Sequence, residues 1–510
     1  MLGVRSRDVD CAFKLIDRSL LADVALTGEA AAISPEILAK ISVDGARIVQ
    51  HPVGHYPREH GEQTGARLGV IVRSLLSLVR VRLQITRRWL AWPTRRRWVT
   101  PGDPVLLLVT AAAVVLAAIA FLEMTATGAV LAYPDATSHL LIARRVLESP
   151  TNGVAQLGGV WLPLPHLLAL PLVWHEALYT SGFAGSVVSM IAYVVTVRYL
   201  YRIGTTIASS RFAGVVAAGL FAANPNVLYL QSTAMTETLL FACVAAAVFH
   251  LDRWCREGGY RNLVATSFAV LLATLTRYEG WVLAVSVLAV IAYVEVRKRR
   301  PIERVEASLI FYGFVAFAGV VGWLVWNAVL FGNPLNWQNG EYADSSLWVG
   351  EADRAVGDLG IATATYWTAI TLTAGTVTPL LGLGGLVVHL MRTRARPKSV
   401  GLYPLLAFGP FFVVALFTGQ RPLHVPQING DLYNVRFGLI MLLPAAIFAG
   451  YLVSLASLVV ERSRRPAVPT PFAAVRLLRS AVIQRRALVG SGRGVARRTP
   501  TRRMIRPAGL

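Results

Sequence analysis

Cysteine and charge are both scarce in this chain of 510 residues, which holds three cysteines and only 15% charged residues. Cys11, Cys243 and Cys255 lack the spacing of metal ligands, so neither a disulfide framework nor a zinc site is predicted. The N-terminus also lacks the basic and then apolar pattern of a cleaved signal peptide. A hydrophobic content of 55% and a mean hydropathy of +0.54 are too high for a soluble multidomain protein. These values predict a membrane protein.

Acidic residues are few relative to basic ones. The chain has 50 Lys and Arg residues against 28 Asp and Glu residues, which gives a formal net charge of +22. In a soluble protein this excess would indicate binding to nucleic acid, but here the arginines gather between apolar runs and in the C-terminal tail. That distribution is typical of cytoplasmic loops beside anionic lipid. We therefore expect membrane lipids, and no nucleic acid, as partners.

About ten apolar runs are long enough to cross a hydrocarbon core of roughly 30 Å. They cover residues 104 to 130, 181 to 200, 206 to 223, 227 to 250, 261 to 276, 280 to 296, 307 to 331, 366 to 390, 401 to 418 and 436 to 460. The pattern predicts an α-helical polytopic membrane domain over residues 104 to 460.

The loops between these runs predict how the chain is oriented. Clusters of arginine and lysine precede span one and follow spans two, four, six, eight and ten. Because basic residues accumulate on the cytoplasmic side, all six clusters lie on that side if both termini are cytoplasmic. The loops at residues 131 to 180, 332 to 365 and 419 to 435 then face outward. We expect a multi-pass protein of the cytoplasmic membrane with its active site on the outer face.

The segments that flank the membrane domain differ from it in composition. Residues 1 to 66 mix acids, bases and apolar residues as a small soluble domain does. Residues 67 to 103 form a basic amphipathic linker, and residues 461 to 510 are rich in Arg, Pro and Gly. A disordered basic cytoplasmic tail is the interpretation of the last segment, with a membrane-surface segment as the alternative.

Local signals in the first segment predict a small, incomplete α/β unit. Ser34 is placed to cap a helix whose first residue is Pro35, with Glu36 in its first turn. A strand is predicted around residues 47 to 53.

Three stretches give this segment a resemblance to the C-terminal third of family 2 glycosyltransferases of the polyprenyl-phosphate sugar synthase type. They are Cys11 to Lys14, Glu36, and Arg58 to Thr64. The nucleotide-binding half and its Asp-x-Asp are missing, so donor synthesis by this segment alone is not expected. In that family the Arg58 loop would touch phosphate, and a surface basic loop is the alternative. The resemblance makes a polyprenyl-phosphate sugar synthase a candidate partner.

The stretch YPDATSHLLIARRV, residues 133 to 146, follows the first apolar run directly. On a helix at about 100° per residue, Asp135 and His139 project close together beside an apolar stripe. Arg144 and Glu148 are expected to pair on the opposite face. This pattern predicts a surface helix that turns Asp135 and His139 toward protein and lipid. The alternative is that Asp135 only caps the helix.

Further ionisable residues are predicted near the same outer face. Arg277 and Glu279 fall at the outer end of span five, and Arg436 falls at the outer end of span ten. Both arginines run against the positive-inside bias, so each needs a partner. Glu237 is predicted to lie buried in the outer half of span four, where an ionisable residue indicates function.

These residue types suit an anionic substrate that dissolves in lipid. A phosphate on a polyprenyl tail meets both conditions, because guanidinium groups bind phosphate and the bilayer dissolves the tail. Sugar transfer from such a donor needs a base for the acceptor hydroxyl and cations for the departing phosphate. Asp135 suits the first role and Arg436 the second.

Five motifs give residues 104 to 460 a resemblance to GT-C membrane glycosyltransferases, similar to the protein O-mannosyltransferase and aminoarabinose transferase group of family 39. They are Asp135 in the first outer loop, WLPLPH (161 to 166), TRYEG (276 to 280), GNPL (332 to 335) and Arg436-Phe437. Many members carry an Asp-Glu pair in the first loop, whereas here Ala136 follows Asp135. The resemblance implies a GT-C fold of about ten transmembrane helices with surface helices on the outer face.

The predicted reaction moves a hexosyl or pentosyl group from a polyprenyl-phosphate sugar to an acceptor hydroxyl, with inversion. The acceptor is a glycan, a lipid or a protein. Asp135 is the predicted base, Arg277 and Arg436 hold phosphate, and Glu237 and Glu279 position donor or acceptor.

Two histidines are further candidates for the predicted site, and the sequence leaves open whether a metal binds there. His139 is predicted to orient Asp135 or to contact the donor phosphate, with a simple polar contact as the alternative. His166 is a candidate substrate-binding residue, although a histidine in a proline-rich turn is more often structural. No cofactor is required, and some GT-C enzymes use a divalent metal between their acids. Two dispersed carboxylates do not decide this point.

Two rival functions fit a ten-span bundle with buried charge. A lipid-linked sugar flippase or transporter should show internal repeats and helices broken near the membrane midplane. The span pattern shows no clear repeat, and the ionisable groups gather at the outer surface instead of lining a path. A non-catalytic membrane anchor is the third hypothesis, and the outward motifs argue against it.

Overall fold

The computed structural model describes residues 103–341, 343 and 353–464, together with residues 14–17, 21, 26, 33–43, 48–49 and 77. It divides into two compact units, Met1–Asp103 and Pro104–Leu510. The Arg58 loop and the C-terminal tail from residue 465 lie outside the described residues. The predicted strand, the Cys11 to Lys14 stretch and the linker are only partly described. The structure describes Lys14 of the Cys11 stretch and residues 77 and 103 of the linker. Ile48 and Val49 are described and belong to no strand.

The first unit contains helix α2 (Ile33–Val43). This helix begins one residue before Ser34, so the prediction that Ser34 caps it is wrong. Lys14 Nζ lies 3.1 Å from Ser34 Oγ and donates a hydrogen bond to it. Glu36 and Lys40 form a buried ion pair of 2.5 Å at the four-residue spacing of a helix.

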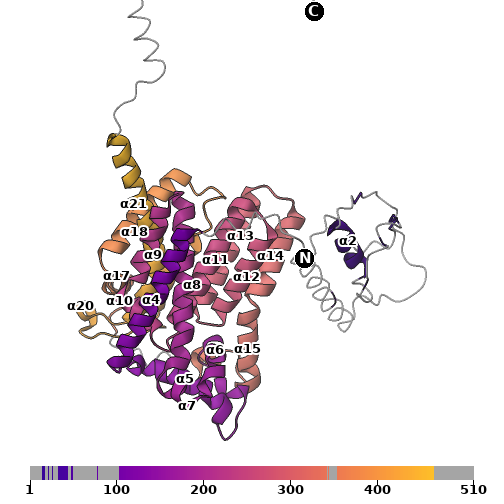
Figure 1. Cartoon of the computed structure of the whole chain (residues 1–510). Coiled ribbons are helices and arrows are strands. Elements are labelled where there is room, and N and C mark those ends of the chain that lie inside the picture. The colour runs from indigo at the N-terminus through magenta and orange to yellow at the C-terminus, as the bar shows by residue number, and fades with distance from the viewer. Residues whose placement is uncertain are drawn as a thin grey trace, which may run out of the picture. The chain divides into compact units, whose positions relative to one another are not determined.

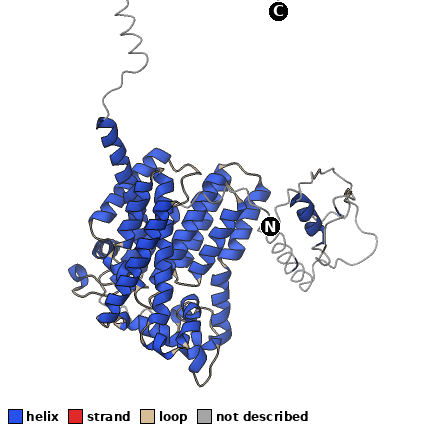
Figure 2. Cartoon of the chain, viewed as in Figure 1, coloured by secondary structure: helices blue, strands red, loops and turns tan. Residues whose placement is uncertain are grey.

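Helices build the second unit, and no extended strand forms within its described residues (Figures 1 and 2). In chain order they are α4 (Pro104–Ala126), η3 (Ala129–Leu131), α5 (Pro134–Glu148), η4 (Val154–Leu157), α6 (Leu164–Val173), α7 (Glu176–Thr180), α8 (Phe183–Ala208), α9 (Arg211–Ala222), α10 (Pro225–Gln231), α11 (Glu237–Glu257), α12 (Tyr260–Thr274), α13 (Glu279–Arg297), α14 (Ile302–Ala316), α15 (Ala318–Phe331), α16 (Asn336–Asn339), α17 (Leu359–Ala374), α18 (Val377–Thr393), η6 (Tyr403–Ala407), α19 (Phe408–Phe417), α20 (Pro426–Asn429), η7 (Val435–Met441) and α21 (Leu442–Arg464).

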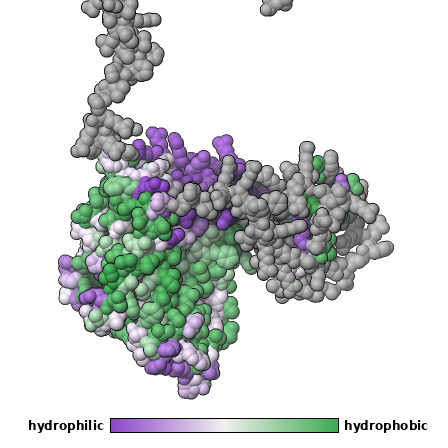
Figure 3. Space-filling model, in the orientation of Figure 1, coloured by the Kyte–Doolittle hydropathy of each residue, from purple (hydrophilic) through white to green (hydrophobic). Residues whose placement is uncertain are grey.

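Five helices of the described residues are long and apolar enough to cross a membrane: α4, α8, α11, α13 and the stretch Val435–Ser457. Three bent pairs, α9 with α10, α14 with α15 and α17 with α18, raise the number to as many as eight if each pair is one span. Figure 3 shows a broad band of hydrophobic residues on the flank of the bundle, with hydrophilic residues toward its two ends. The chain is a helical polytopic membrane protein.

Breaks within apolar runs explain why fewer spans are found than the ten predicted. The run at 366 to 390 bends by 110° at Gly375, whose φ is 74°, and the run at 307 to 331 bends by 42° at Phe317. The run at 261 to 276 forms α12, which has only 15 residues. A helix of that length rises about 22 Å, which is less than the hydrocarbon thickness. Apolarity alone does not show where such breaks fall.

Hydroxyl groups on α8 hold the segment that precedes α11. Ser186 Oγ donates to the carbonyl oxygen of Ser232 at 3.0 Å, and Ser189 Oγ donates to that of Met235 at 2.9 Å. All four residues are buried. These hydrogen bonds satisfy backbone groups that no helix satisfies. They fix the chain just before Glu237.

The short helices α5, α6 and α7 lie together at the end of the bundle opposite the C-terminal end of α21 (Figure 1). The apolar side of α5 is buried, and α6 packs against it. The end of the bundle with these short helices also carries the charged residues described next.

Candidate active site

Asp135 lies in the first turn of α5, because Pro134 begins this helix and Tyr133 is its N-cap. The alternative that Asp135 caps the helix is therefore wrong. A proline suits the first position because the backbone N–H it lacks would have no helical partner there. The predicted pair on the opposite face forms, with Arg144 Nε 2.6 Å from Glu148 Oε2. The Asp135 side chain stays 34% exposed.

Glu237 is the first residue of α11, and its side chain is only 4% exposed. The prediction of an unbroken span over residues 227 to 250 is wrong, because α10 ends at Gln231 and residues 232 to 236 separate the two helices. Glu237 therefore lies at a helix start, where the helix dipole favours a carboxylate. Its burial requires a further partner for its charge.

Arg277 and Glu279 lie where α12 gives way to α13, and Glu279 is the first residue of α13. Gly280 allows this turn, because a Cβ atom there would lie 2.2 Å from the carbonyl oxygen of Ala273. Any other residue would push the two helices apart. The close approach brings Arg277 and Glu279 to the same point of the bundle.

Arg436 is the second residue of η7 and follows Asn434, whose φ of 51° is left-handed. Asparagine is among the residues that adopt this conformation most readily. Gly438 lets η7 lie against α17, because a Cβ atom there would lie 2.6 Å from the carbonyl carbon of Ala369. The Arg436 guanidinium lies over the ring of Tyr133 at 4.4 Å from its centroid.

Five of the predicted residues form one line of alternating charges, which we call the charge chain. Asp135 Oδ2 lies 2.5 Å from Arg436 Nη2, and Arg436 Nε lies 2.9 Å from Glu237 Oε1. Glu237 Oε1 lies 3.1 Å from Arg277 Nη1, and Arg277 Nη2 lies 3.0 Å from Glu279 Oε1. Four of the five side chains are less than 15% exposed, the exception being Asp135. Buried ion pairs of this kind need every charge matched.

Three buried atoms of the charge chain have no hydrogen-bond partner among the described residues. They are Glu237 Oε2, Arg277 Nε and Arg436 Nη1. An unmade hydrogen bond at a buried charged group is costly, so such atoms indicate a place for a ligand or water. Here they offer one acceptor and two donors.

The environment of Arg277 favours its charged form. Burial alone would lower the pKa of this guanidinium, but the charges of Glu279 and Glu237 outweigh burial and raise the pKa above its usual value. Arg277 Nη1 also donates to Thr236 Oγ1 at 2.9 Å. Arg277 is thus a fixed cation at the centre of the site.

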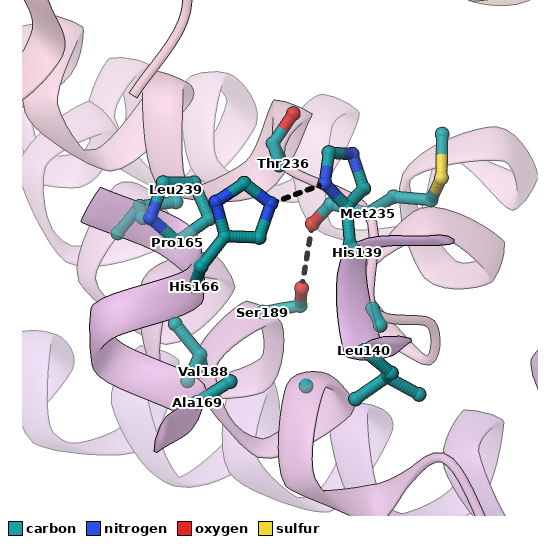
Figure 4. Close-up of a pocket in the computed structure, with 12 residues that line it drawn as sticks. His139, Leu140, Pro165, His166, Ala169, Val188, Ser189, Met235, Thr236 and Leu239 are labelled. Carbon is teal, nitrogen blue, oxygen red and sulfur yellow. Dashed lines mark hydrogen bonds between the residues drawn. The ribbon is translucent and has the colours of Figure 1, made fainter. Parts of the chain in front are cut away.

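His139 and His166 form a buried pair of side chains (Figure 4). His139 Nδ1 lies 2.9 Å from His166 Nε2, and the ring of Trp161 lies 4.5 Å from that of His139. Burial lowers the pKa of His139 well below its usual value, as do the charges of His166, Arg277 and Arg436; burial lowers the pKa of His166 to about 4. Both rings are therefore neutral near pH 7.

The histidine pair lines a pocket with Ser189, Met235 and Thr236 (Figure 4). Within the described residues no hydrogen bond joins His139 to Asp135. His139 instead contacts His166. No contact in the structure supports the prediction that His139 orients Asp135. A contact of either histidine with substrate stays a prediction.

Three residues near the charge chain were not predicted from the sequence. Thr236 bonds Arg277, Tyr133 lies under Arg436, and Arg421 lies over the ring of Tyr278 at 5.6 Å from its centroid. The sequence did hold a signal for Arg421, because it lies in the loop at residues 419 to 435, which is predicted to face outward, where a basic residue runs against the positive-inside bias. Thr236 and Tyr133 had no signal in the sequence.

Each acid of the charge chain lies against an arginine. Among the described residues, no group of three or more His, Cys, Asp and Glu side chains is placed to hold a metal ion. The donor set that does converge is carboxylate with guanidinium, which suits hydroxyl and phosphate groups.

The comparison with protein families bears on the middle of the chain. Residues 176–326 match the model of the dolichyl-phosphate-mannose-protein mannosyltransferase family. This mannosyltransferase match runs from α7 into α15, so it contains Glu237, Arg277 and Glu279 but neither Asp135 nor Arg436. It supports a relationship with membrane glycosyltransferases of the GT-C class. No curated protein matches the chain.

Proposed function

We propose that the chain is an inverting membrane glycosyltransferase that moves a sugar from a polyprenyl-phosphate donor to an acceptor hydroxyl on the outer face of the cytoplasmic membrane. Both termini are cytoplasmic in this proposal. The mannosyltransferase match supports the class of reaction and donor. The charge chain supports the location of the site, at the end of the bundle that carries α5 to α7.

Asp135 is the proposed base. Its side chain is 34% exposed, whereas those of Glu237 and Glu279 are each 4% exposed. An acceptor that arrives from the aqueous side therefore reaches Asp135 first. Only Oδ2 of Asp135 is bonded to Arg436, which leaves Oδ1 for the acceptor hydroxyl. A base must lie within hydrogen-bond reach of the proton it removes.

The two arginines are the proposed phosphate-binding groups of the site, and the buried acids position them. Glu237 lies between Arg277 and Arg436 and holds both guanidinium groups at one place. Each arginine keeps a buried N–H without a partner among the described residues, Nε in Arg277 and Nη1 in Arg436. Preorganised cations of this kind stabilise the charge that develops on a leaving phosphate.

The observation that carries this proposal is the charge chain itself, which unites residues of four separate elements at one end of the bundle. The rival, a lipid-linked sugar transporter, is favoured by the three bent helix pairs. None of the five charge-chain residues lies at those bends. The charged groups therefore mark a site at one end and no path through the bundle.

A transfer assay separates the two functions. Membranes that contain the chain are incubated with labelled polyprenyl-phosphate sugars, and the label is followed into glycan, lipid and protein fractions. We expect label to leave the donor lipid in membranes with the wild-type chain and to stay on it with Asp135→Asn. Label that changes sides while still attached to the lipid would support the transporter and overturn the transferase.

A further inference from the structure

Arg421 is a cation near the charge chain, and no carboxylate of the described residues forms an ion pair with it. It follows α19 in the outer loop and is partly buried. Within the described residues it has no hydrogen bond and no ion pair, and its one contact of note is the ring of Tyr278, 5.6 Å from the guanidinium carbon. A partly buried arginine without a carboxylate or carbonyl partner is unusual, because burial of a charge requires compensation.

The other two arginines of the site are already matched by acids. Arg436 bridges Asp135 and Glu237, and Arg277 bridges Glu237 and Glu279. The charge chain alone holds three carboxylates and two guanidinium groups. A phosphate that approached these five residues would meet net negative charge. Arg421 supplies the further positive charge that an anionic ligand needs.

The electrostatic neighbours of Arg421 place it at one end of the charge chain. Burial lowers its pKa, the charge of Glu279 raises it, and the charge of Arg277 lowers it. The Arg421 guanidinium lies over the ring of Tyr278, the residue before Glu279. This contact places Arg421 toward the Glu279 end of the charge chain. A phosphate between Arg421 and Arg277 would relieve the repulsion between these two cations.

Aromatic side chains pack around Tyr278, the ring over which Arg421 lies. The Tyr278 and Trp337 rings stack with centroids 4.6 Å apart, and Trp281 meets Trp337 edge-on at 4.9 Å. Tyr278 is fixed because its hydroxyl donates to the carbonyl oxygen of Val160 at 2.6 Å and accepts from Trp323 Nε1 at 3.2 Å. Arginine binds over aromatic rings without losing its hydrogen-bond donors. The Tyr278 ring thus holds the guanidinium in place and leaves its N–H groups for a ligand.

We propose that Arg421 is a third phosphate-binding arginine beside Arg277 and Arg436, and that with Arg277 it holds the phosphate of the polyprenyl donor at the Glu279 end of the charge chain, away from the acceptor at Asp135. This inference rests on the proposed function. The acceptor oxygen gives its proton to Asp135 and bonds to the anomeric carbon. The bond from that carbon to the phosphate oxygen breaks, and its electron pair leaves with the phosphate. Attack and departure at opposite ends of one site produce inversion at this carbon.

Lipid binding tests the proposal without relying on transfer. Wild-type, Arg421→Gln and Arg421→Lys chains at full length are reconstituted in nanodiscs, and tryptophan fluorescence is titrated with polyprenyl monophosphate or with neutral polyprenol. We expect Arg421→Gln to weaken binding of the phosphate lipid about tenfold to a hundredfold, because charge-assisted hydrogen bonds are lost. The affinity of Arg421→Lys for the phosphate lipid should lie between those of Arg421→Gln and wild type. The affinity for polyprenol should be the same in all three proteins.

Arg354→Gln is the matched control, since Arg354 also lies in an outer loop and bonds only the carbonyl oxygen of Ile428 among the described residues. It should bind the phosphate lipid as wild type does. Wild-type strength in Arg421→Gln would overturn the role of Arg421 and leave the proposed function standing. A wild-type chain that binds the two lipids equally would overturn the proposed function as well. If Arg421→Gln fails to fold, as judged by gel filtration, Arg421→Lys decides, and unchanged binding of the phosphate lipid by a folded lysine variant would overturn the role proposed for the Arg421 guanidinium.

Discussion

Arg436 Nη2 lies 2.5 Å from Asp135 Oδ2, although 301 residues separate these two side chains in the chain. Nε of the same guanidinium lies 2.9 Å from Glu237 Oε1. The planar fork of arginine makes this double contact with two carboxylates from different helices. A direct ion pair therefore joins the proposed base, Asp135, to Arg436, one of the arginines proposed to bind phosphate.

Removal of the Asp135 charge should abolish transfer and leave the protein inserted. Asp135→Asn keeps the size of the side chain but removes the base, so transfer should fall about 100-fold to 10,000-fold. The measurement is release of labelled sugar from polyprenyl phosphate in reconstituted membranes, with gel filtration and melting temperature as checks on folding. Glu148→Gln, on the exposed face of the same helix, is the control and should retain near wild-type rate. A transfer rate near that of wild type in Asp135→Asn would show that Asp135 is not the catalytic base.

Arg436→Lys tests whether geometry matters in addition to charge. Lysine keeps the positive charge but cannot present two fixed N–H groups to Asp135 and Glu237 at once. We expect transfer to fall at least about tenfold, because a charge-assisted hydrogen bond is lost. Arg145→Lys is the control, since Arg145 bonds only the side chain of Gln156 in the described structure. Equal transfer rates for Arg436→Lys and Arg145→Lys would show that a positive charge at residue 436 is sufficient and that the guanidinium geometry does not matter.

Gly280→Ala should disturb the site through packing alone. The added Cβ would lie 2.2 Å from the carbonyl oxygen of Ala273, so α12 and α13 must move apart and carry Arg277 and Glu279 with them. Overpacking of this kind costs about 1–3 kcal/mol of unfolding free energy. The melting temperature and the transfer rate should both fall. Gly322→Ala, where no atom lies within 4 Å of the added Cβ, should lower neither; a matching loss there would point to a general effect of alanine.

The sequence alone predicted which charged residues belong to the candidate site. Arg277 and Arg436 lie at span ends that are predicted to face outward, where arginine is unusual, and this alone predicts that each has an acidic partner. All five members of the charge chain were among the predicted site residues. Which acid meets which arginine was not predictable, because those contacts depend on how helices from distant parts of the chain pack.

The limits of the sequence are clearest at helix ends. Glu237 was placed within a span, yet the chain breaks before it and makes it a helix start. Apolar residues on both sides of residues 232 to 236 hide that break, which the hydroxyls of α8 stabilise. The pairing of His139 with His166 was hidden for a similar reason, since α5 and α6 lie beside each other only in the folded bundle.

The buried histidine pair should make the protein acid-sensitive. Burial lowers the pKa of His166 to about 4, and the pKa of His139 is lowered as well, whereas a histidine in an unfolded chain titrates near 6.5. The unfolded state therefore binds more protons than the folded state between about pH 4 and 6.5, so stability is full above the unfolded pKa and falls as the pH decreases. The shift of His166 alone corresponds to about 3 kcal/mol of unfolding free energy.

A melting-temperature series from pH 7.5 to 4.5 in nanodiscs measures this loss. His166→Gln keeps a polar partner for His139 Nδ1 but cannot gain a proton, so its melting temperature should decrease less with acid than that of wild type. His175→Gln is the control, because His175 is exposed at the start of α7 and should leave the acid response unchanged. Parallel curves for wild type and His166→Gln would mean that the histidine pair does not set the acid sensitivity.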